Sequence, residues 1–422
     1  MSRSGFGVMA LVRRSLRQHL VSSVVTTLSV GLAAGLTMAV FAINRQTYEA
    51  FTGGEAGFDA VLGARGSQLQ LVLNTVFHLD TSPGNIPWSL FEQVASSPRV
   101  ALAVPFVVGD NYQGFRVVGT SEEMFTKFRY RSGQGFTVES GGRVFNPARA
   151  EAVVGSYAAR RLGLAVGDTI QPYHGLTSDE RQRHEERYTV VGVLTPTNSP
   201  SDRVIWIPLD GLYRMSGHVL RGTGETYRPE AGVEIPDEHR EVSAVMLKFT
   251  TPQAGFTFSQ QINRQGRVAT LAWPIGRVMA DLFERVGWVS RILGLVAYLV
   301  VAVATASILA SIYNTMHERR REFAILRALG ARRRTVFGVI VLEATTIAAL
   351  GVLVGFVVYG GILAAAVVTV RAQTGVVLDP WRVDSALWIT PMVMIAAGAL
   401  AGLAPAVKAY RTDVASNLSP LS

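Results

Sequence analysis

Residues 292–316 read ILGLVAYLVVAVATASILASIYNTM, and residues 317–335, which follow directly, read HERRREFAILRALGARRRT. The first stretch contains no acidic or basic side chain, and a helix of about 20 apolar residues is long enough to cross the hydrocarbon core of a membrane. The second stretch is crowded with arginine. An apolar helix that ends at a basic loop is typical of a membrane-spanning segment, so this pair predicts an integral membrane protein.

Three other stretches share the same lack of charge, and they lie at residues 20–44, 344–370 and 385–407. The whole chain is 49% hydrophobic and only 17% charged, whereas about a quarter of the residues of a soluble protein are charged. The first stretch is too long for the apolar core of a signal peptide, and no A-x-A cleavage motif follows it. The sequence therefore predicts four transmembrane helices, at residues 20–44, 289–316, 336–370 and 385–407.

The net charge of +9 arises almost entirely beside these spans. The long segment between residues 45 and 285 is nearly neutral, with about 24 basic and 25 acidic residues. The excess basic residues are Arg3, Arg13, Arg14, Arg17, Arg319, Arg320, Arg321, Arg327, Arg332, Arg333, Arg334, Lys408 and Arg411. Short loops rich in Arg and Lys stay in the cytoplasm. The charge is thus explained by topology, and no nucleic-acid partner is expected.

The resulting topology is that of a multi-pass protein of the inner (cytoplasmic) membrane, with both termini in the cytoplasm. The predicted cytoplasmic parts are residues 1–19, 317–335 and 408–422. Residues 45–288 are expected to form a large periplasmic domain, and residues 371–384 a short external loop. Residues 1–19 suit either an amphipathic helix on the inner membrane surface or the cytoplasmic end of a long first helix.

The inserted segment reads as a mixed α/β domain, because apolar β-rich runs recur between clusters of Gly, Pro and Asn. Strands are predicted at residues 101–108, 115–118, 152–154, 188–194, 204–207 and 242–249, with helices at residues 88–95, 156–162 and 208–215. The last part of the insert is expected to continue into the second span as one long helix. The fold class is therefore an α-helical membrane protein with four transmembrane helices and a large α/β extracytoplasmic domain between the first two.

Pairs of glycines four residues apart occur in three spans: Gly31 and Gly35, Gly351 and Gly355, Gly398 and Gly402. This spacing lets two helices approach closely within a membrane. It predicts helix packing, either within one chain or between two chains.

Known catalytic motifs are missing from the sequence. There is no phosphate-binding G-x-x-x-x-G-K-[ST] loop and no G-x-S-x-G motif, and the chain has no cysteine. We predict no enzymatic activity. A polar loop with ligands suited to zinc contains His174, Asp179, Glu180, His184 and Glu185; a solvated loop is the favoured interpretation, and no metal site is predicted.

The basic segment 317–335 also has an ordered apolar side. Phe323, Leu326 and Leu329 share one helical face, and Gly330 is placed to end the helix as its C′ residue. A short amphipathic helix of this kind can dock into a groove of a soluble partner.

Here the sequence resembles a known family. Glu318-x-x-x-Glu322-Phe-Ala-Ile-Leu-Arg-Ala-Leu-Gly-Ala331, followed by a span with Glu343 near its start, is similar to the signature of FtsX-like permeases, the membrane subunits of MacB- and LolC-type ABC transporters. Residues 151–168, 188–194 and 203–210 resemble parts of the MacB-like periplasmic core domain in the family's order. The layout of one span, a large domain and three further spans agrees as well.

The resemblance implies an unfused permease that forms a dimer with a second copy or a paralogue and binds separate ABC ATPase subunits. ATP and Mg²⁺ would be held by those subunits, and this chain would hold no cofactor. The segment 317–335 would be the coupling loop. Its residues expected at the ATPase are Glu318, Arg319, Arg320, Arg321, Glu322, Phe323, Leu326, Arg327, Gly330 and Ala331.

The implied function is mechanotransmission: ATP hydrolysis moves the periplasmic domain, which extracts or exports a lipoprotein, lipid, peptide or amphipathic compound. The spans hold almost no ionisable residue, which favours transmission of force over conduction of a polar solute. Other expected partners are membrane lipid and a periplasmic adaptor or substrate-carrier protein. Two alternatives stay open: a signalling module that activates a cell-wall hydrolase or a sensor, and a metal-handling ABC system.

Overall fold

The computed structural model describes residues 3–52, 57–130, 133–175, 177, 179–215 and 235–411. The predicted tail beyond residue 411 lies outside these ranges. The chain divides into a helical unit, comprising Met1–Thr47, Val286–Val368 and Asp379–Ser422, and an α/β unit, comprising Tyr48–Arg285 and Thr369–Leu378.

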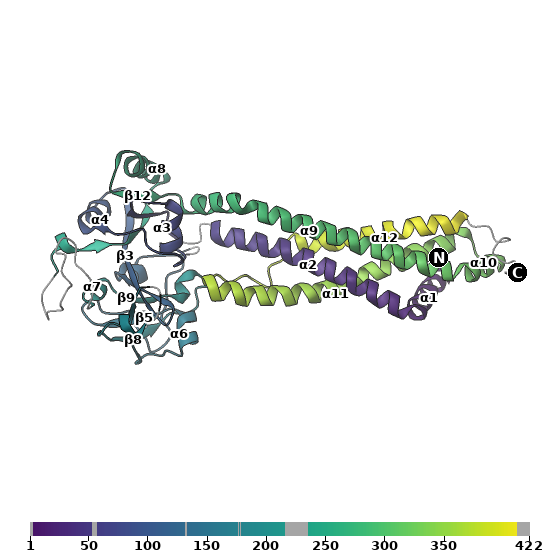
Figure 1. The fold of residues 1–422 in the computed structure, drawn as a ribbon, viewed down its shortest axis with the longest axis horizontal. Coiled ribbons are helices and arrows are strands. Elements are labelled where there is room, and N and C mark those ends of the chain that lie inside the picture. Colours follow the sequence, from purple (N-terminus) through teal and green to yellow (C-terminus); the bar gives the residue numbers. More distant parts are fainter. Residues whose placement is uncertain are drawn as a thin grey trace. The chain divides into compact units, whose positions relative to one another are not determined.

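The helices of the first unit are α1 (Arg3–Gln18), α2 (Leu20–Thr52), α9 (Ile275–Glu318), α10 (Arg320–Ala328), α11 (Arg333–Thr374) and α12 (Ala386–Arg411) (Figure 1). Four of the described helices, α2, α9, α11 and α12, are long and apolar enough to cross a membrane. The four predicted spans are therefore confirmed as helices of this type. Helix α9 begins well before the predicted span, so the expected single long helix is also confirmed.

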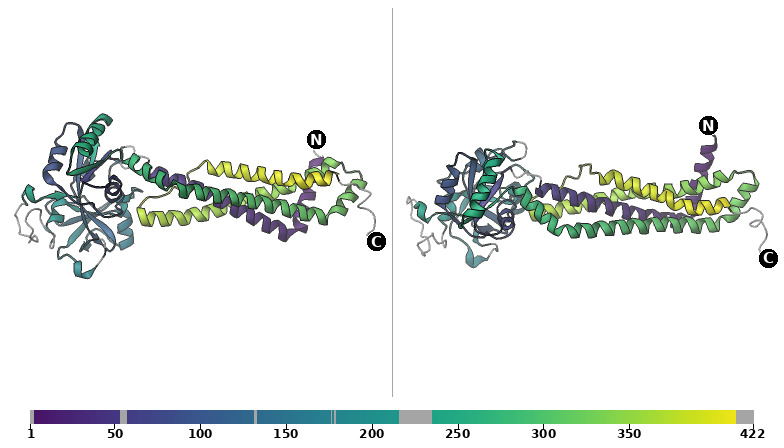
Figure 2. Two further views of the ribbon diagram at one scale, coloured as in Figure 1. Left: turned by 45° about the horizontal axis from the view of Figure 1, so that its top comes forward. Right: turned by 90° about the horizontal axis from the view of Figure 1, so that it is seen from above.

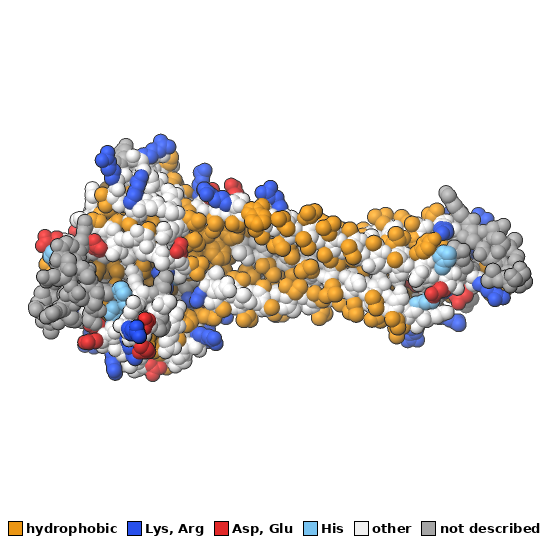
Figure 3. All heavy atoms as spheres, viewed as in Figure 1, with side chains coloured by type: hydrophobic (Ala, Val, Ile, Leu, Met, Phe, Trp, Pro, Cys, Tyr) orange, Lys and Arg blue, Asp and Glu red, His pale blue; other side chains and the backbone are white. Residues whose placement is uncertain are grey.

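Large apolar side chains are exposed along all four of these helices. Leu32, Leu295, Val303, Val357 and Leu400 are each between 58% and 76% exposed, and Figure 3 shows hydrophobic side chains covering the visible face of the helices. A water-soluble bundle would bury such a continuous apolar surface. A lipid environment explains it.

The first two helices are separate elements that meet at His19. Helix α1 leaves the bundle at an angle to α2 (Figure 2), and its Val12 and Ser15 are buried while Arg13 and Arg14 are exposed. This favours the interpretation of the N-terminal segment as a distinct amphipathic helix over an extension of the first span.

The glycine pairs mark two helix crossings within the chain. A Cβ atom added to Gly35 would lie 2.7 Å from the carbonyl oxygen of Gly355, and one added to Gly355 would lie 2.8 Å from Cβ of Ala34. Gly31 and Gly351 meet at the same α2–α11 crossing. Gly398 and Gly402 of α12 pack in the same way on Ala348 and Ala344 of α11. All six glycines thus serve packing inside the chain, because any side chain would force these helices apart.

A buried carboxylate fastens the beginning of α12 to α2. Asp384, whose side chain is 3% exposed, accepts a hydrogen bond from Gln46 Nε2 and pairs with Arg45 Nε at 3.4 Å. The backbone N–H of Asp379 donates to Gln46 Oε1 at 3.0 Å. These contacts fix the path of the chain between α11 and α12.

The described strands of the α/β unit form a ten-stranded sheet in the order β12-β1-β11-β3-β4-β9-β5-β8-β6, with β7 paired to β3, and a two-stranded β10-β2 ribbon. Their bounds are β1 (Ala60–Ala64), β2 (Ile86–Pro87), β3 (Val100–Tyr112), β4 (Phe115–Thr120), β5 (Glu151–Val154), β6 (Thr169–Ile170), β7 (Tyr173–His174), β8 (Tyr188–Val193), β9 (Ile205–Pro208), β10 (Glu241–Val242), β11 (Ala244–Phe249) and β12 (Ala269–Ala272). Each of the six predicted strands coincides with one of these, so the mixed α/β prediction is confirmed.

Short helices join the strands: α3 (Gln68–Thr75), α4 (Trp88–Ala95), α5 (Glu123–Thr126), α6 (Ser156–Leu162), α7 (Leu209–Tyr213) and α8 (Pro252–Gln260), with the 3₁₀ turns η1 (Glu180–Gln182), η2 (Pro200–Arg203) and η3 (Asp237–His239) and a π-helical turn η4 (Gln261–Gln265). The predicted helices at residues 88–95 and 156–162 are confirmed, and that at residues 208–215 corresponds to α7.

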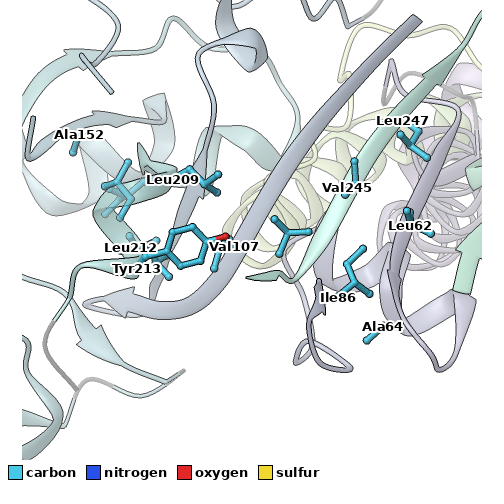
Figure 4. Close-up of a cluster of buried hydrophobic side chains, with 14 of the residues drawn as sticks. Leu62, Ala64, Ile86, Val107, Ala152, Leu209, Leu212, Tyr213, Val245 and Leu247 are labelled. Carbon is cyan, nitrogen blue, oxygen red and sulfur yellow. The ribbon is translucent and has the colours of Figure 1, made fainter. Parts of the chain in front are cut away.

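The sheet is covered on both faces, which is why strands such as β1 are apolar at every position. One core contains Leu62, Ile86, Val245 and Leu247 (Figure 4). The opposite core includes the fully buried Trp206.

Three long helices have one end inside the α/β unit. Phe51 of α2 stacks on Phe77 with ring centroids 4.6 Å apart, and Met279 of α9 is 1% exposed in the core. The end of α11 packs on η2: Gly375, with φ +76°, lies so close that an added Cβ would be 2.9 Å from Pro200 Cα. Part of the segment predicted as a short external loop is therefore helix that belongs to the α/β unit.

Candidate functional site

The segment between α9 and α11 contains one short helix, α10, closed by a left-handed glycine. The N–H of Gly330 donates to the carbonyl of Arg327, and the N–H of Ala331 donates to that of Leu326, both at 3.0 Å. Gly330 has φ +98°. This is a Schellman motif with Gly330 at C′, the position that the sequence predicts.

A buried polar network fixes this helix to α1 and α11. Arg319, which is 4% exposed, donates from Nη1 to Ser15 Oγ at 2.6 Å. Ser15 in turn donates to Glu343 Oε1 at 2.6 Å, and Arg319 Nη1 lies 3.8 Å from Glu343 Oε2. Ser15 and Glu343 are also buried. Since a buried charge needs a hydrogen-bonded partner, the three side chains hold one another in place.

The network continues into the first turn of α10. Arg319 Nε donates to Glu322 Oε2 at 2.9 Å, and this hydrogen bond lowers the pKa of the Glu322 carboxyl. The Arg319 guanidinium also lies over the Phe323 ring, 5.0 Å from its centroid. Beside the network, Glu318 pairs with His19 at 3.2 Å. Five side chains from three parts of the sequence, namely Ser15, Arg319, Glu322, Phe323 and Glu343, thus determine where α10 begins.

The predicted apolar docking face needs a correction. Phe323 is 9% exposed and Leu326 is partly buried, and both pack on the core of the helical unit. The apolar side chains that remain exposed are Ile325, at 45%, and Leu329, at 80%. Phe323 and Leu326 face inward because the neighbouring helices offer them an apolar surface, which the sequence of this segment alone does not show.

The remaining predicted coupling residues lie around this helix. Arg321 and Gly330 are exposed, whereas Arg327 and Ala331 are half-buried. The side chain of Arg320 lies outside the described part of the structure. The exposed side of α10 therefore combines Ile325 and Leu329 with Arg321 and Glu322, a mixed surface of the kind that contacts a soluble protein.

The α/β unit has a cavity of about 540 Å³ whose walls combine aromatic, aliphatic and polar side chains. Its lining includes Phe51, Phe58, Phe77, Phe128, Tyr130, Phe136, Trp206 and Trp273. Among its polar side chains, His78 lies edge-on to Trp206 with ring centroids 5.7 Å apart. Burial lowers the pKa of His78 to about 3, with a further contribution from Arg116 and Arg203, so its imidazole is neutral at physiological pH.

In the polar loop singled out from the sequence, Asp179 and Glu180 form hydrogen bonds within the loop itself. Asp179 accepts from the N–H of Arg181 at 3.0 Å, and Glu180 accepts from Tyr173 Oη at 2.9 Å. The two histidines of this loop turn instead to Asp110 of β3. The sequence does not identify Asp110, Ser15 or His78 as site residues. Each of them has its role only through contacts with distant segments of the chain.

Comparison with known proteins gives two family matches. The MacB-like periplasmic core domain matches residues 23–265, more than half of the chain, and the FtsX-like permease C-terminal domain matches residues 294–414. The Uncharacterized ABC transporter permease MJ1507 of Methanocaldococcus jannaschii is 24% identical over 283 residues, which are 62% of this chain and 62% of that protein. The chain thus spans less than two thirds of that relative.

Among solved structures, the periplasmic region of MacB from Actinobacillus actinomycetemcomitans matches 56% of this chain and 98% of its own length, with a TM-score of 0.35 and 9% identity. The extracellular domain of the ABC-type transporter YknZ from Gram-positive bacteria matches 54% and 95%, with a TM-score of 0.25 and 14% identity. From the two family matches, the chain belongs to the family of ABC transporter permeases that combine a MacB-like periplasmic core domain with an FtsX-like permease C-terminal domain.

Proposed function

We propose that this permease is a mechanical coupling subunit, which receives the motion of a separate ABC ATPase at α10 and delivers it to the α/β unit. The observation that carries the proposal is the fixation of α10. Through Arg319, Ser15 and Glu343, a displacement of this short helix must move α1 and α11 or break a buried network. Breaking such a network costs several kcal/mol, so concerted movement is favoured.

Helices α9 and α11 can transmit this motion, because each extends from the region of α10 to the α/β unit. Helix α11 carries Glu343 near one end, and its other end packs on η2 through Gly375. Helix α9 leads into α10 at one end, and at the other it begins with Ile275, which is buried in the α/β core. Since an α-helix resists changes in length through its backbone hydrogen bonds, both can transmit displacement.

The proposed orientation places α10 in the cytoplasm and the α/β unit in the periplasm, because the arginine-rich segments lie beside α10 and the N-terminus. A second copy or a paralogue would complete the membrane assembly. The aromatic side chains that line the cavity of the α/β unit favour a cargo with an apolar part, such as a lipid, a lipoprotein or an amphipathic compound.

Site-specific cross-linking tests this proposal. The chain has no cysteine, so Leu329→Cys, in the exposed end of α10, gives a single reactive thiol. A thiol-to-amine cross-linker applied to native membranes is expected to capture an ABC ATPase subunit. Val166→Cys, at a 49% exposed apolar position of the α/β unit, is the matched control. Capture from both positions, or from neither, would contradict the assignment of α10.

A further inference from the structure

Two histidines and one aspartate converge at one place on the α/β unit. Asp110 of β3 and His174 of β7 are directly opposite each other in an antiparallel strand pair. His174 Nδ1 lies 3.2 Å from Asp110 Oδ1, and His184 Nε2 lies 3.1 Å from the same oxygen. The three atoms all lie within 4.8 Å of one another.

We propose that Asp110, His174 and His184 form a binding site for a divalent cation, with Zn²⁺ as the preferred ion. Imidazole nitrogen and carboxylate oxygen are ligands that zinc accepts, at about 2.0–2.1 Å each, which places neighbouring ligand atoms of a tetrahedron about 3.3 Å apart. The two nitrogen-to-oxygen distances already match this spacing. The two nitrogens lie within 4.8 Å of each other, so a small rotation of an imidazole can bring them to this spacing.

The exposure of the three side chains suits such a site. The side chains of Asp110 and His184 are 0% and 4% exposed, whereas that of His174 is 54% exposed. The buried pair gives a fixed half of the site, and the exposed imidazole can move by a small rotation onto an arriving ion. The fourth position of the tetrahedron then faces solvent on the side of His174, where water or a ligand can occupy it.

Hydrogen bonds around the site hold its backbone in place without an ion. Asn111 Nδ2 donates to the carbonyl of Gly175 at 2.9 Å, and the N–H of Gly175 donates to the carbonyl of Gly109 at 2.7 Å. The N–H of His184 donates to the carbonyl of Pro172 at 3.0 Å. Gln171 Nε2 donates to the carbonyl of His184 at 2.6 Å. The ligands are thus preorganised, which reduces the entropy lost on binding.

The close approach of these three side chains has an alternative explanation, which is a network of hydrogen bonds without metal. In that case each imidazole must carry a proton on the nitrogen that faces Asp110 Oδ1. With zinc bound, those nitrogens must be deprotonated, and the proton of a neutral imidazole can move through solvent to its other ring nitrogen. The two explanations therefore differ in stoichiometric metal content.

The test uses the full chain in detergent, purified with a tag that contains no histidine and stripped of metal with a chelator. Equilibrium dialysis against Zn²⁺ is expected to give one tightly bound ion per chain. In His174→Ala, which leaves no buried cavity, zinc affinity should fall by more than the roughly 10–100-fold that loss of an outer-shell partner causes. His239→Ala is the matched control and should bind like the unaltered chain.

The thermal midpoint gives a second readout, because a ligand that binds only the folded state raises it. Zinc should raise the midpoint of the unaltered chain and of His239→Ala, and should leave that of His174→Ala unchanged. Asp110→Asn serves as a second ligand variant and should also lose tight binding. Substoichiometric zinc on the unaltered chain, or equal binding by His174→Ala and His239→Ala, would overturn the proposal.

Discussion

Arg319 and Glu343 lie 24 positions apart in the sequence and form a buried ion pair, with Nη1 3.8 Å from Oε2 and the Ser15 hydroxyl hydrogen-bonded to both side chains. The pair connects the residue directly before α10 with the first half of α11. It links the apolar core of the helical unit to the segment 317–335 through two buried charged side chains.

Removal of one partner of the Arg319–Glu343 ion pair should destabilise the chain more than removal of both. Arg319→Met leaves the Glu343 carboxylate buried without its cation, which should cost about 3–5 kcal/mol of stability. The double variant Arg319→Met/Glu343→Leu should recover most of this loss. The thermal midpoint of the full chain in detergent measures both. Arg334→Met, at an exposed arginine of the same basic segment, should have almost no effect, and a double variant as unstable as the single one would contradict the ion-pair account.

The α2–α11 crossing should not tolerate even one methyl group. In Gly355→Ala the new Cβ would lie 2.8 Å from Cβ of Ala34 and 3.2 Å from the Gly31 carbonyl oxygen, so the helices must separate and the thermal midpoint should fall. Gly361→Ala, in the same helix with no atom near the added Cβ, should gain up to about 1 kcal/mol, since Ala has the higher helix propensity. Equal shifts in both variants would exclude close packing at Gly355.

His78 should make the α/β unit sensitive to mild acid. Its pKa is about 3 in the folded chain and about 6.5 when unfolded, so below pH 6.5 the unfolded state binds the extra proton. Stability should therefore fall as the pH drops from about 6.5 toward 3, by at most about 1.4 kcal/mol per pH unit from this group.

His78→Asn removes this titration and suits the backbone, because Asn tolerates the φ of +54° found there. Thermal midpoints at pH 7 and pH 5, followed by tryptophan fluorescence, should show a smaller fall for His78→Asn than for the unaltered chain. His239→Asn should fall like the unaltered chain. An equal fall in all three proteins would mean that His78 does not contribute.

The attachment of α11 to the α/β unit should depend on Gly375. Gly375→Ala adds both the strain of a positive φ and a contact of 2.9 Å with Pro200 Cα. Gly141→Ala has comparable strain at φ +87° with no atom nearby. The difference between the two variants therefore reports the steric contact at Gly375. Hydrogen exchange at residues 369–378 should accelerate in Gly375→Ala, while Gly141→Ala should leave that segment protected. Unchanged protection in both would show that this contact is dispensable.

The sequence predicts the elements well because each has a local signal. Uncharged stretches of membrane length identify α2, α9, α11 and α12, and alternation of apolar runs with Gly, Pro and Asn identifies the main strands. Gly330 marks the end of α10 because few other residues adopt φ +98°. These signals need no knowledge of the three-dimensional neighbours.

The sites are harder to predict because they depend on contacts between distant segments. Arg319 has arginine neighbours on its C-terminal side, and only its burial against Ser15 and Glu343 distinguishes it. Asp110 lies 64 residues before His174 and joins it only through the β3–β7 pairing. Phe323 looks like part of an exposed face until the neighbouring helices cover it.

The proposed contact between the exposed side of α10 and an ABC ATPase can be measured as the recovery of ATPase with the purified permease. Ile325→Asp/Leu329→Asp places two carboxylates at that surface, and Phe256→Asp places one at a 57% exposed position of the α/β unit. We expect the co-purified ATPase activity to fall at least about tenfold in the α10 variant, which corresponds to an interface loss of about 1.4 kcal/mol or more. The Phe256→Asp variant should retain this activity. Equal recovery of ATPase activity with both variants would mean that this side of α10 does not bind the ATPase.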